Sequence, residues 1–219
     1  MNLSDFLLID ASSPACAVVA LLGEDGASWR AFETSADPAL EGVFAAAERV
    51  RPRLDAAGFL FCEGPGSILG IRVAAAAIRG RLALGTRVPV LAFGSLHLAA
   101  ALLLRANPRE RDFTLVAESR MNAWNVLRVR DGAPEPDFRE ARTPELAAAV
   151  AGTVFAFPHR RSAPPLECAP LDVPSLLRAD PAVFAETPSL LRDRGDAPDA
   201  VNTATPAGYA KWTPGRHRA

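Results

Sequence analysis

A glycine turn between an apolar run and an alanine-rich helix constrains the fold of this chain most. Residues 59–62 are apolar and have the length of a buried strand. The turn that follows contains Gly64-Pro65-Gly66, and glycine adopts backbone angles that other residues avoid. Ser67 is the expected N-cap of a helix that continues to about Gly85, and residues 88–91 are the next expected strand. This order predicts a right-handed crossover of an α/β sheet.

The same turn is open to two interpretations. A glycine loop before a helix can bind an anion, because free amides and the helix dipole favour negative charge there. However, residues 64–72 lack the Gly-Lys-Ser/Thr ending of a P-loop and the spacing of a dinucleotide fingerprint. The residues alone therefore favour a structural turn, and an anion site stays open as the alternative.

The order of elements in the first half recurs in the second half. Apolar runs predict strands over residues 6–9, 15–22 and 27–33, followed by a helix from Asp37 onward and, after the crossover, a helix over 95–105. In the second half the expected elements are strands over 113–117, 124–130 and 137–142, a short helix over 144–150, and a strand over 153–157.

The repeat also extends to single residues. Residues 5–12 align without a gap with residues 112–119, and Asp, Phe, Leu and Ser recur at matching positions. Two further pairs at the same offset are Ile9 with Val116 and Val19 with Val126. These matches predict that one lobe arose by duplication of the other.

We therefore expect an α/β protein of two lobes, residues 1–108 and residues 109–219. Each lobe has the order βββαβα, but the second is abbreviated and ends in a proline-rich segment. Two lobes with this order resemble the fold class of actin, hexokinase and the heat-shock ATPases, which close around ATP.

Composition narrows the functional classes further. The formal net charge of −1 offers no global field for nucleic acid. The three cysteines, Cys16, Cys62 and Cys168, are odd in number and far apart, which favours thiols in a reducing compartment and predicts no metal site. Because no apolar run is long enough to span a bilayer and no signal peptide is evident, we expect a cytoplasmic protein that does not bind a membrane.

The two loops expected to bind phosphates, one after the first strand of each lobe, contain no glycine. ATPases of this fold class bind phosphates with loops after the first strand of each lobe, where glycines let backbone amides approach. Here these loops are residues 10–15 and 117–122. Asp10 is present, but its counterpart is Ala117, and Glu118 is displaced to the opposite face of the strand. Nucleotide hydrolysis and a cofactor are therefore not expected.

Two motifs resemble those of the TsaB (YeaZ) family. Residues 6–13 resemble its IDTS motif, and the glycine turn resembles its GPGSFTGLR motif. The motif positions of the turn are Gly64, Pro65, Gly66, Ser67, Gly70 and Arg72. The third motif, DARxGEVY, falls at residues 118–125, where Arg120 is retained and Ala123 replaces the glutamate. The resemblance is to a divergent member, with Asp10, Ser12 and Arg120 as a vestigial nucleotide site.

The resemblance implies a non-catalytic role. In that family TsaB is the partner subunit of the catalytic TsaD, joined by the ATPase TsaE, in making threonylcarbamoyladenosine on tRNA. It implies contact with tRNA only through the complex, and a homodimer when the partner is absent. Two alternatives stay open: a small kinase or ATPase of the same fold that uses Asp10, and a family relic with another protein partner.

The pairing in that family uses the helices of the first lobe, and the sequence offers suitable faces. The expected interface residues on these two helices are Leu40, Val43, Phe44, Ala47, Val73, Ala74, Ala76, Ala77 and Gly80. Small side chains let another helix approach closely, and the apolar ones supply area to bury. The alternative is that these faces only cover the sheet of their own lobe.

Overall fold

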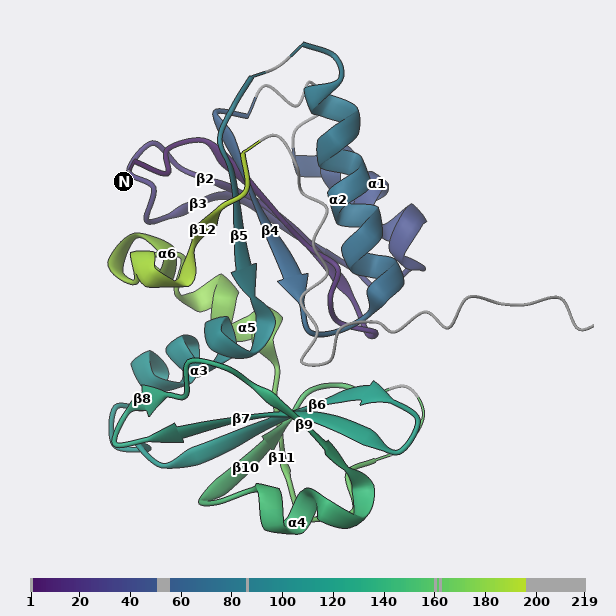
Figure 1. Cartoon of the computed structure of the whole chain (residues 1–219). Helices are drawn as coiled ribbons and strands as arrows, with labels where there is room; N and C mark the ends of the chain where they lie inside the picture. The colour runs from purple at the N-terminus through teal and green to yellow at the C-terminus, as the bar shows by residue number, and fades with distance from the viewer. Residues whose placement is uncertain (1, 51–55, 86, 160, 162, 196–219) are drawn as a thin grey trace, which may run out of the picture.

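The computed structural model describes residues 2–50, 56–85, 87–159, 161 and 163–195 of the 219-residue chain. Two sheets lie one above the other in Figure 1, each at the centre of one lobe, with helix α3 (Ser95–Ala106) between them. The two-lobed α/β fold expected from the sequence is therefore confirmed.

The first sheet has the strand order β12-β5-β4-β1-β2-β3. Its strands are β1 (Phe6–Asp10), β2 (Ala17–Leu22), β3 (Trp29–Ser35), β4 (Gly58–Gly64), β5 (Val90–Gly94) and β12 (Arg192–Asp193). Strand β1 pairs in parallel with β4, and β4 in parallel with β5. The helix between β4 and β5 is α2 (Ile68–Leu82), so the predicted crossover is confirmed.

Helices cover both faces of the first sheet, which explains why its inner strands are continuous apolar runs. Helices α1 (Ala39–Val50) and α2 lie side by side on one face, where their apolar residues pack on Ile9, Val19 and Phe61. The other face packs against α3, α5 (Val173–Ala179) and α6 (Val183–Glu186). This packing on both faces fixes the positions of the C-terminal ends of β1 and β4.

The second sheet repeats the plan of the first with fewer helices. Its elements are β6 (Phe113–Arg120), β7 (Ala123–Arg130), β8 (Ala133–Pro134), β9 (Arg139–Arg142), β10 (Thr153–Ala156) and β11 (Ala169–Pro170), with the helical turns η1 (Thr143–Glu145) and α4 (Leu146–Ala149). Strand β6 lies between antiparallel β7 and parallel β10, as β1 lies between β2 and β4. The described residues between β10 and β11 form no helix, so the second lobe is abbreviated as expected.

The register of the strands supports the duplication. Ile9 pairs with Val19 across β1 and β2, and Val116 pairs with Val126 across β6 and β7. The sequence alignment matches Ile9 with Val116 and Val19 with Val126, so the pair of strands β1 and β2 in the first lobe corresponds to the pair β6 and β7 in the second. The same contacts therefore occur at the same place in both lobes.

Four predicted strands, those expected from residues 15, 27, 88 and 137, begin two residues too early, because β2, β3, β5 and β9 begin at Ala17, Trp29, Val90 and Arg139. The third strand begins at Trp29 because the amides of Ala27 and Ser28 donate to Asp25 Oδ1 in the preceding turn. The crossover strand begins at Val90 rather than at residue 88, and it continues to Gly94. The α2 helix ends at Leu82, three residues before the expected Gly85.

The C-terminal segment returns to the first lobe, which corrects the expectation that residues 109–219 all belong to the second. Strand β12 pairs antiparallel with β5 at the edge of the first sheet. Figure 1 shows α5 between the lobes and α6 beside the first sheet near β12, and the 3₁₀ turn η2 (Pro188–Leu190) follows α6 in the chain. Residues 196–219 of the predicted second lobe lie outside the described residues. Among the described helices none is both long and apolar enough to cross a membrane.

Candidate functional site

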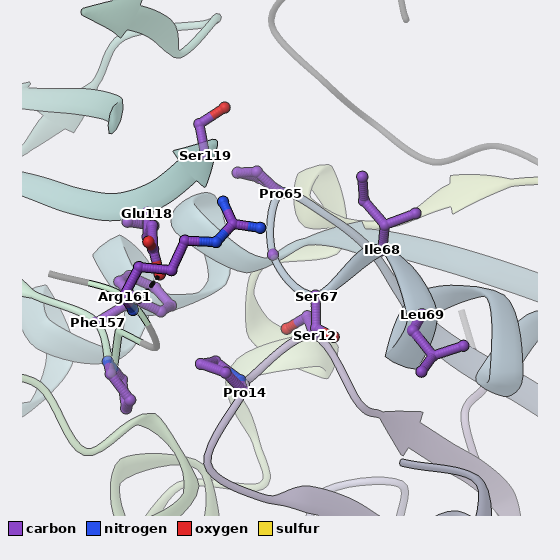
Figure 2. A pocket seen from close by; sticks show the side chains of 13 residues that line it. Ser12, Pro14, Pro65, Ser67, Ile68, Leu69, Glu118, Ser119, Phe157 and Arg161 are labelled. Carbon is purple, nitrogen blue, oxygen red and sulfur yellow. Dashed lines mark hydrogen bonds between the residues drawn. The ribbon is translucent and has the colours of Figure 1, made fainter. Parts of the chain in front are cut away.

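The candidate site is a cleft between the two lobes. One cavity of about 240 Å³ has the loop after β1 and the glycine turn as its first wall, and residues 117–119, Phe157, Pro158 and Arg161 as its second. Figure 2 shows Ser12, Pro14 and Ser67 on the side opposite Glu118 and Arg161. The motif turn and both candidate phosphate loops therefore meet at one place.

The glycine turn is docked on the loop after β1. The backbone amide of Ser67 donates to the carbonyl oxygen of Ser12 over 2.7 Å. A Cβ on Gly66 would lie 2.3 Å from that same oxygen, and Gly66 has a φ of +159°. Ser95 Oγ donates to the carbonyl oxygen of Pro65 over 2.5 Å. Glycine is thus needed at position 66 because two segments of backbone approach each other closely.

Ser67 caps the helix as predicted. Its Oγ accepts from the amide of Gly70 over 3.3 Å, and its carbonyl oxygen accepts from the amide of Ile71. The amides of Ser67, Gly70 and Ile71 are therefore already paired within the protein. Of the two interpretations left open by the sequence, these bonds favour the structural turn over the anion site.

Asp10 lies in a second compartment of the cleft, with a volume of about 160 Å³. Its side chain is buried, and Oδ1 accepts from the amide of Ser12 over 2.8 Å. Burial raises the pKa of the Asp10 carboxyl, although contacts with Ser12 and Cys62 oppose that effect. Burial and then the charge of Asp10 raise the pKa of the Cys62 thiol, which makes it an inert side chain.

The third residue of the expected vestigial site lies elsewhere. Arg120 borders neither of these two compartments, and its guanidinium Nη2 donates to Glu140 Oε1 over 2.6 Å at the outer end of β6. Glu118 borders the cleft instead, where its Oε2 accepts from the backbone amide of Arg161 over 3.4 Å. The structure brings Asp10 and Ser12 together and leaves Arg120 apart. No sequence pattern indicated Arg161, because it lies 43 residues from Glu118.

The described part of the chain contains no group of three side chains that could hold a metal ion. The two loops that follow β1 and β6 contain no glycine that would let their amides reach a phosphate, and in the glycine turn the amides of Ser67, Gly70 and Ile71 are already paired. Within the described residues, the cleft holds two small cavities, and the buried carboxylate of Asp10 borders the smaller one.

The expected interface residues divide between two sides of their helices. Val43, Ala47, Val73 and Ala74 are buried in the core beneath the helices, where they contact the sheet of their own lobe. Leu40 and Phe44 are 55% and 49% exposed, and Ala76 and Gly80 are exposed as well, with Ala77 partly so. The first four residues thus cover the sheet, which corrects their placement on an outer face.

The sequence alone matches no protein-family model, and no curated protein gives a significant match. Among solved structures, YeaZ from Pseudomonas aeruginosa is 21% identical, with a TM-score of 0.56 over 87% of this chain and 95% of that one. An uncharacterised protein with similarity to peptidase YeaZ from Pseudomonas aeruginosa is 20% identical, with a TM-score of 0.60 over 91% and 100%. The chain therefore has the fold of YeaZ along nearly its whole described length.

Proposed function

We propose that this chain is a non-catalytic, TsaB-like partner subunit of a TsaD-like transferase that makes threonylcarbamoyladenosine in tRNA. In this proposal the first lobe docks on the transferase, a TsaE-like ATPase joins the assembly, and tRNA is met only through the complex. The fold of YeaZ and the match of the turn motif to the TsaB family support this assignment.

The observation that carries the proposal is an exposed apolar face on the outer side of α1. Leu40 and Phe44 are one helical turn apart, and each leaves about half of its side chain in solvent. Large apolar side chains that cluster on a protein surface mark interaction sites, whereas single scattered ones are ordinary. We call Leu40, Phe44, Ala76, Ala77 and Gly80 the outer face of the α1–α2 pair.

The α2 side of this outer face is shaped for close approach. A Cβ on Gly80 would meet no heavy atom within 4 Å, so the surface there is open. Ala76 lies one turn away and is also exposed. Small residues on one helix let the backbone of a partner helix come near, while Leu40 and Phe44 on the neighbouring helix supply apolar area to bury.

Co-purification tests the proposal directly. The chain is expressed with the TsaD-like subunit of the same genome, and the complex is expected to survive gel filtration. Ala74 is fully buried, so a charge there would break the core; Ala76→Glu tests the surface instead. Ala76→Glu is expected to abolish the complex, and Met121→Glu, on the second lobe, to leave it intact. Capture that is equally strong with Ala76→Glu would contradict the docking face.

The first alternative is an ATP-dependent enzyme that uses Asp10. The buried Asp10 carboxylate and the cleft favour it, but the missing loop glycines and the paired amides of the turn oppose it. Calorimetry with ATP and Mg²⁺ separates the two, because the partner-subunit proposal predicts no heat of binding. The second alternative, a relic with another partner, is favoured if the outer face self-associates but never captures the TsaD-like subunit.

A further inference from the structure

Glu63 is a charged side chain that is wholly enclosed by the protein, with 0% of its surface exposed. Two arginines from the far end of the described chain neutralise it. Arg192 Nη1 donates to Oε1 over 2.8 Å, and Arg194 Nε donates to Oε2 over 2.9 Å. Arg194 Nη2 makes a further short contact with Oε2. A buried carboxylate that loses such partners is strongly destabilising, because an uncompensated charge is left behind.

Arg192 lies in the short strand β12 and Arg194 directly follows it, and the backbone of this segment makes few bonds to the sheet. Strand β12 pairs with β5 through only Arg192 and Asp193, and the amide of Arg194 adds one bond to the carbonyl oxygen of Val90. Residues two apart in an extended strand project to the same side, so both guanidinium groups face Glu63. The ion pairs therefore contribute much of the attachment of this strand.

Glu63 also occupies a special position in its own strand. The pairing of β4 with β5 runs regularly to Cys62, then shifts, and resumes at Gly64. Glu63 stands at this irregularity, directly before the glycine turn. Strand β5 lies between β4 and β12, so the side chain of Glu63 meets the two arginines across β5, at the point where the turn begins.

We propose that Arg192 and Arg194 act as a latch that fixes the glycine turn through Glu63. When the latch is closed, the buried carboxylate is neutralised and the turn stays docked on Ser12 and Ser95. When β12 leaves, Glu63 must hydrate or move, and the start of α2 moves with it. The latch stands independently of the proposed function, although α2 also bears part of the outer face.

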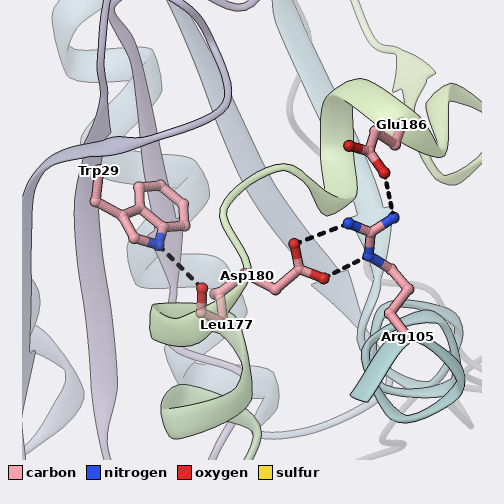
Figure 3. A network of polar contacts seen from close by, with 5 residues as sticks. All are labelled: Trp29, Arg105, Leu177, Asp180 and Glu186. Carbon is pink, nitrogen blue, oxygen red and sulfur yellow. Dashed lines mark hydrogen bonds and ion pairs between the residues drawn. The ribbon is translucent and has the colours of Figure 1, made fainter. Parts of the chain in front are cut away.

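The latch is separate from the other attachments of the C-terminal segment (Figure 3). Trp29 Nε1 donates to the carbonyl oxygen of Leu177 over 2.9 Å. Arg105 binds Asp180 and also Glu186, the latter through Nη1 over 2.6 Å. These contacts hold α5 and α6 against α3 and β3 without using β12. Opening the latch is therefore expected to free residues 192–194 and leave α5 and α6 in place.

Hydrogen exchange of the full-length protein tests the latch. The double variant Arg192→Ala/Arg194→Ala is compared with the wild type at the amides of Ser67, Gly70 and Ile71. Their exchange is expected to accelerate at least about tenfold, because the buried charge loses its partners and the turn opens locally. The amides of β6 and β7, in the other lobe, report that the fold is intact and are expected to keep their protection.

A charge-neutral residue at position 63 supplies the decisive comparison. Glu63→Gln added to the double variant is expected to return the turn to within about threefold of wild-type exchange, since a neutral amide needs no arginine. Arg105→Ala, which cuts the other attachment, is expected to leave the turn unchanged. Unchanged turn exchange in the double variant overturns the proposal, as does a turn that Glu63→Gln fails to restore. If the double variant does not fold, the triple variant is expected to fold, and failure of both also overturns it.

Discussion

The backbone of Gly70 lies against the carbonyl oxygen of Ala11, so closely that a Cβ on Gly70 would be 1.8 Å from that oxygen. This contact joins the first turn of α2 to the loop after β1. Gly80, on the same helix, faces open space. Close packing therefore constrains the backbone at Gly70 but not at Gly80, so the two positions can be compared within one helix.

Gly70→Ala is expected to destabilise the protein by about 1–3 kcal/mol or more, because the added methyl forces two backbone segments apart. Gly80→Ala is the matched control and is expected to gain about 0.5–1 kcal/mol, as alanine is the better helix former. Urea unfolding measures both. Equal effects of the two substitutions would show that the contact with Ala11 is not tight.

Asp10→Asn is expected to stabilise the protein at neutral pH. Burial raises the pKa of Asp10 above its ordinary value of 3.8, so the unfolded chain releases its proton first as pH rises. The folded state consequently loses stability between the unfolded and the folded pKa, and asparagine removes that loss. The side-chain oxygen of asparagine can still accept from the amide of Ser12.

Thermal unfolding of both forms from pH 4 to pH 8 measures this effect. The advantage of Asp10→Asn is expected to be greatest at pH 7 and to shrink toward pH 4, because the carboxyl of the unfolded wild type also takes up its proton as the pH approaches 3.8. A variant that is less stable than the wild type at pH 7 would indicate that the charged carboxylate is needed.

Glu140→Gln, in contrast to Asp10→Asn, is expected to destabilise the protein at neutral pH. Burial is the largest single influence on Glu140 and raises its pKa, but hydrogen bonds from Ser119 and Arg120, with the charges of Arg120 and Arg142, together lower the pKa. The ionised Glu140 side chain therefore stabilises the folded protein at pH values above the ordinary pKa of 4.5. This stabilisation is lost as the pH falls through the pKa of the folded state. The variant should be less stable than the wild type at pH 7 and equal to it in acid, as measured by urea unfolding at both values.

The protein alone is expected to form a homodimer through the outer face of the α1–α2 pair. An exposed apolar face that lacks its partner tends to self-associate, and a two-fold dimer uses the same patch on both copies. Phe44→Glu is expected to give a monomer in light scattering after gel filtration, whereas Met121→Glu, at a more exposed apolar side chain on the second lobe, is expected to remain dimeric. A wild type that is monomeric at all concentrations contradicts this prediction.

The parts of the fold that local sequence determines could be predicted. The glycine turn, its Ser67 cap and the crossover follow from residues that are neighbours in the chain. The duplication also followed, because the matched pairs Ile9 with Val116 and Val19 with Val126 lie in strands with a clear apolar pattern.

The remaining features depend on contacts between distant residues. Apolar spacing placed Val43 and Phe44 on one face, but a helical pattern cannot tell residues that cover the sheet from those that flank it. The pairing of Glu63 with Arg194 joins residues 131 positions apart, and a two-residue strand in a proline-rich segment has no periodicity to reveal it. Arg120 was grouped with Asp10 by motif alone, and the motif does not specify where the side chain at the end of β6 points.

The most direct test of the proposed function is nucleoside analysis of bulk tRNA after deletion of the gene for this chain in its host. Loss of threonylcarbamoyladenosine is predicted, with recovery when the wild-type chain is restored and no recovery with Ala76→Glu. A deletion strain whose tRNA retains its full content of threonylcarbamoyladenosine would contradict the assignment of this chain as a partner of the transferase.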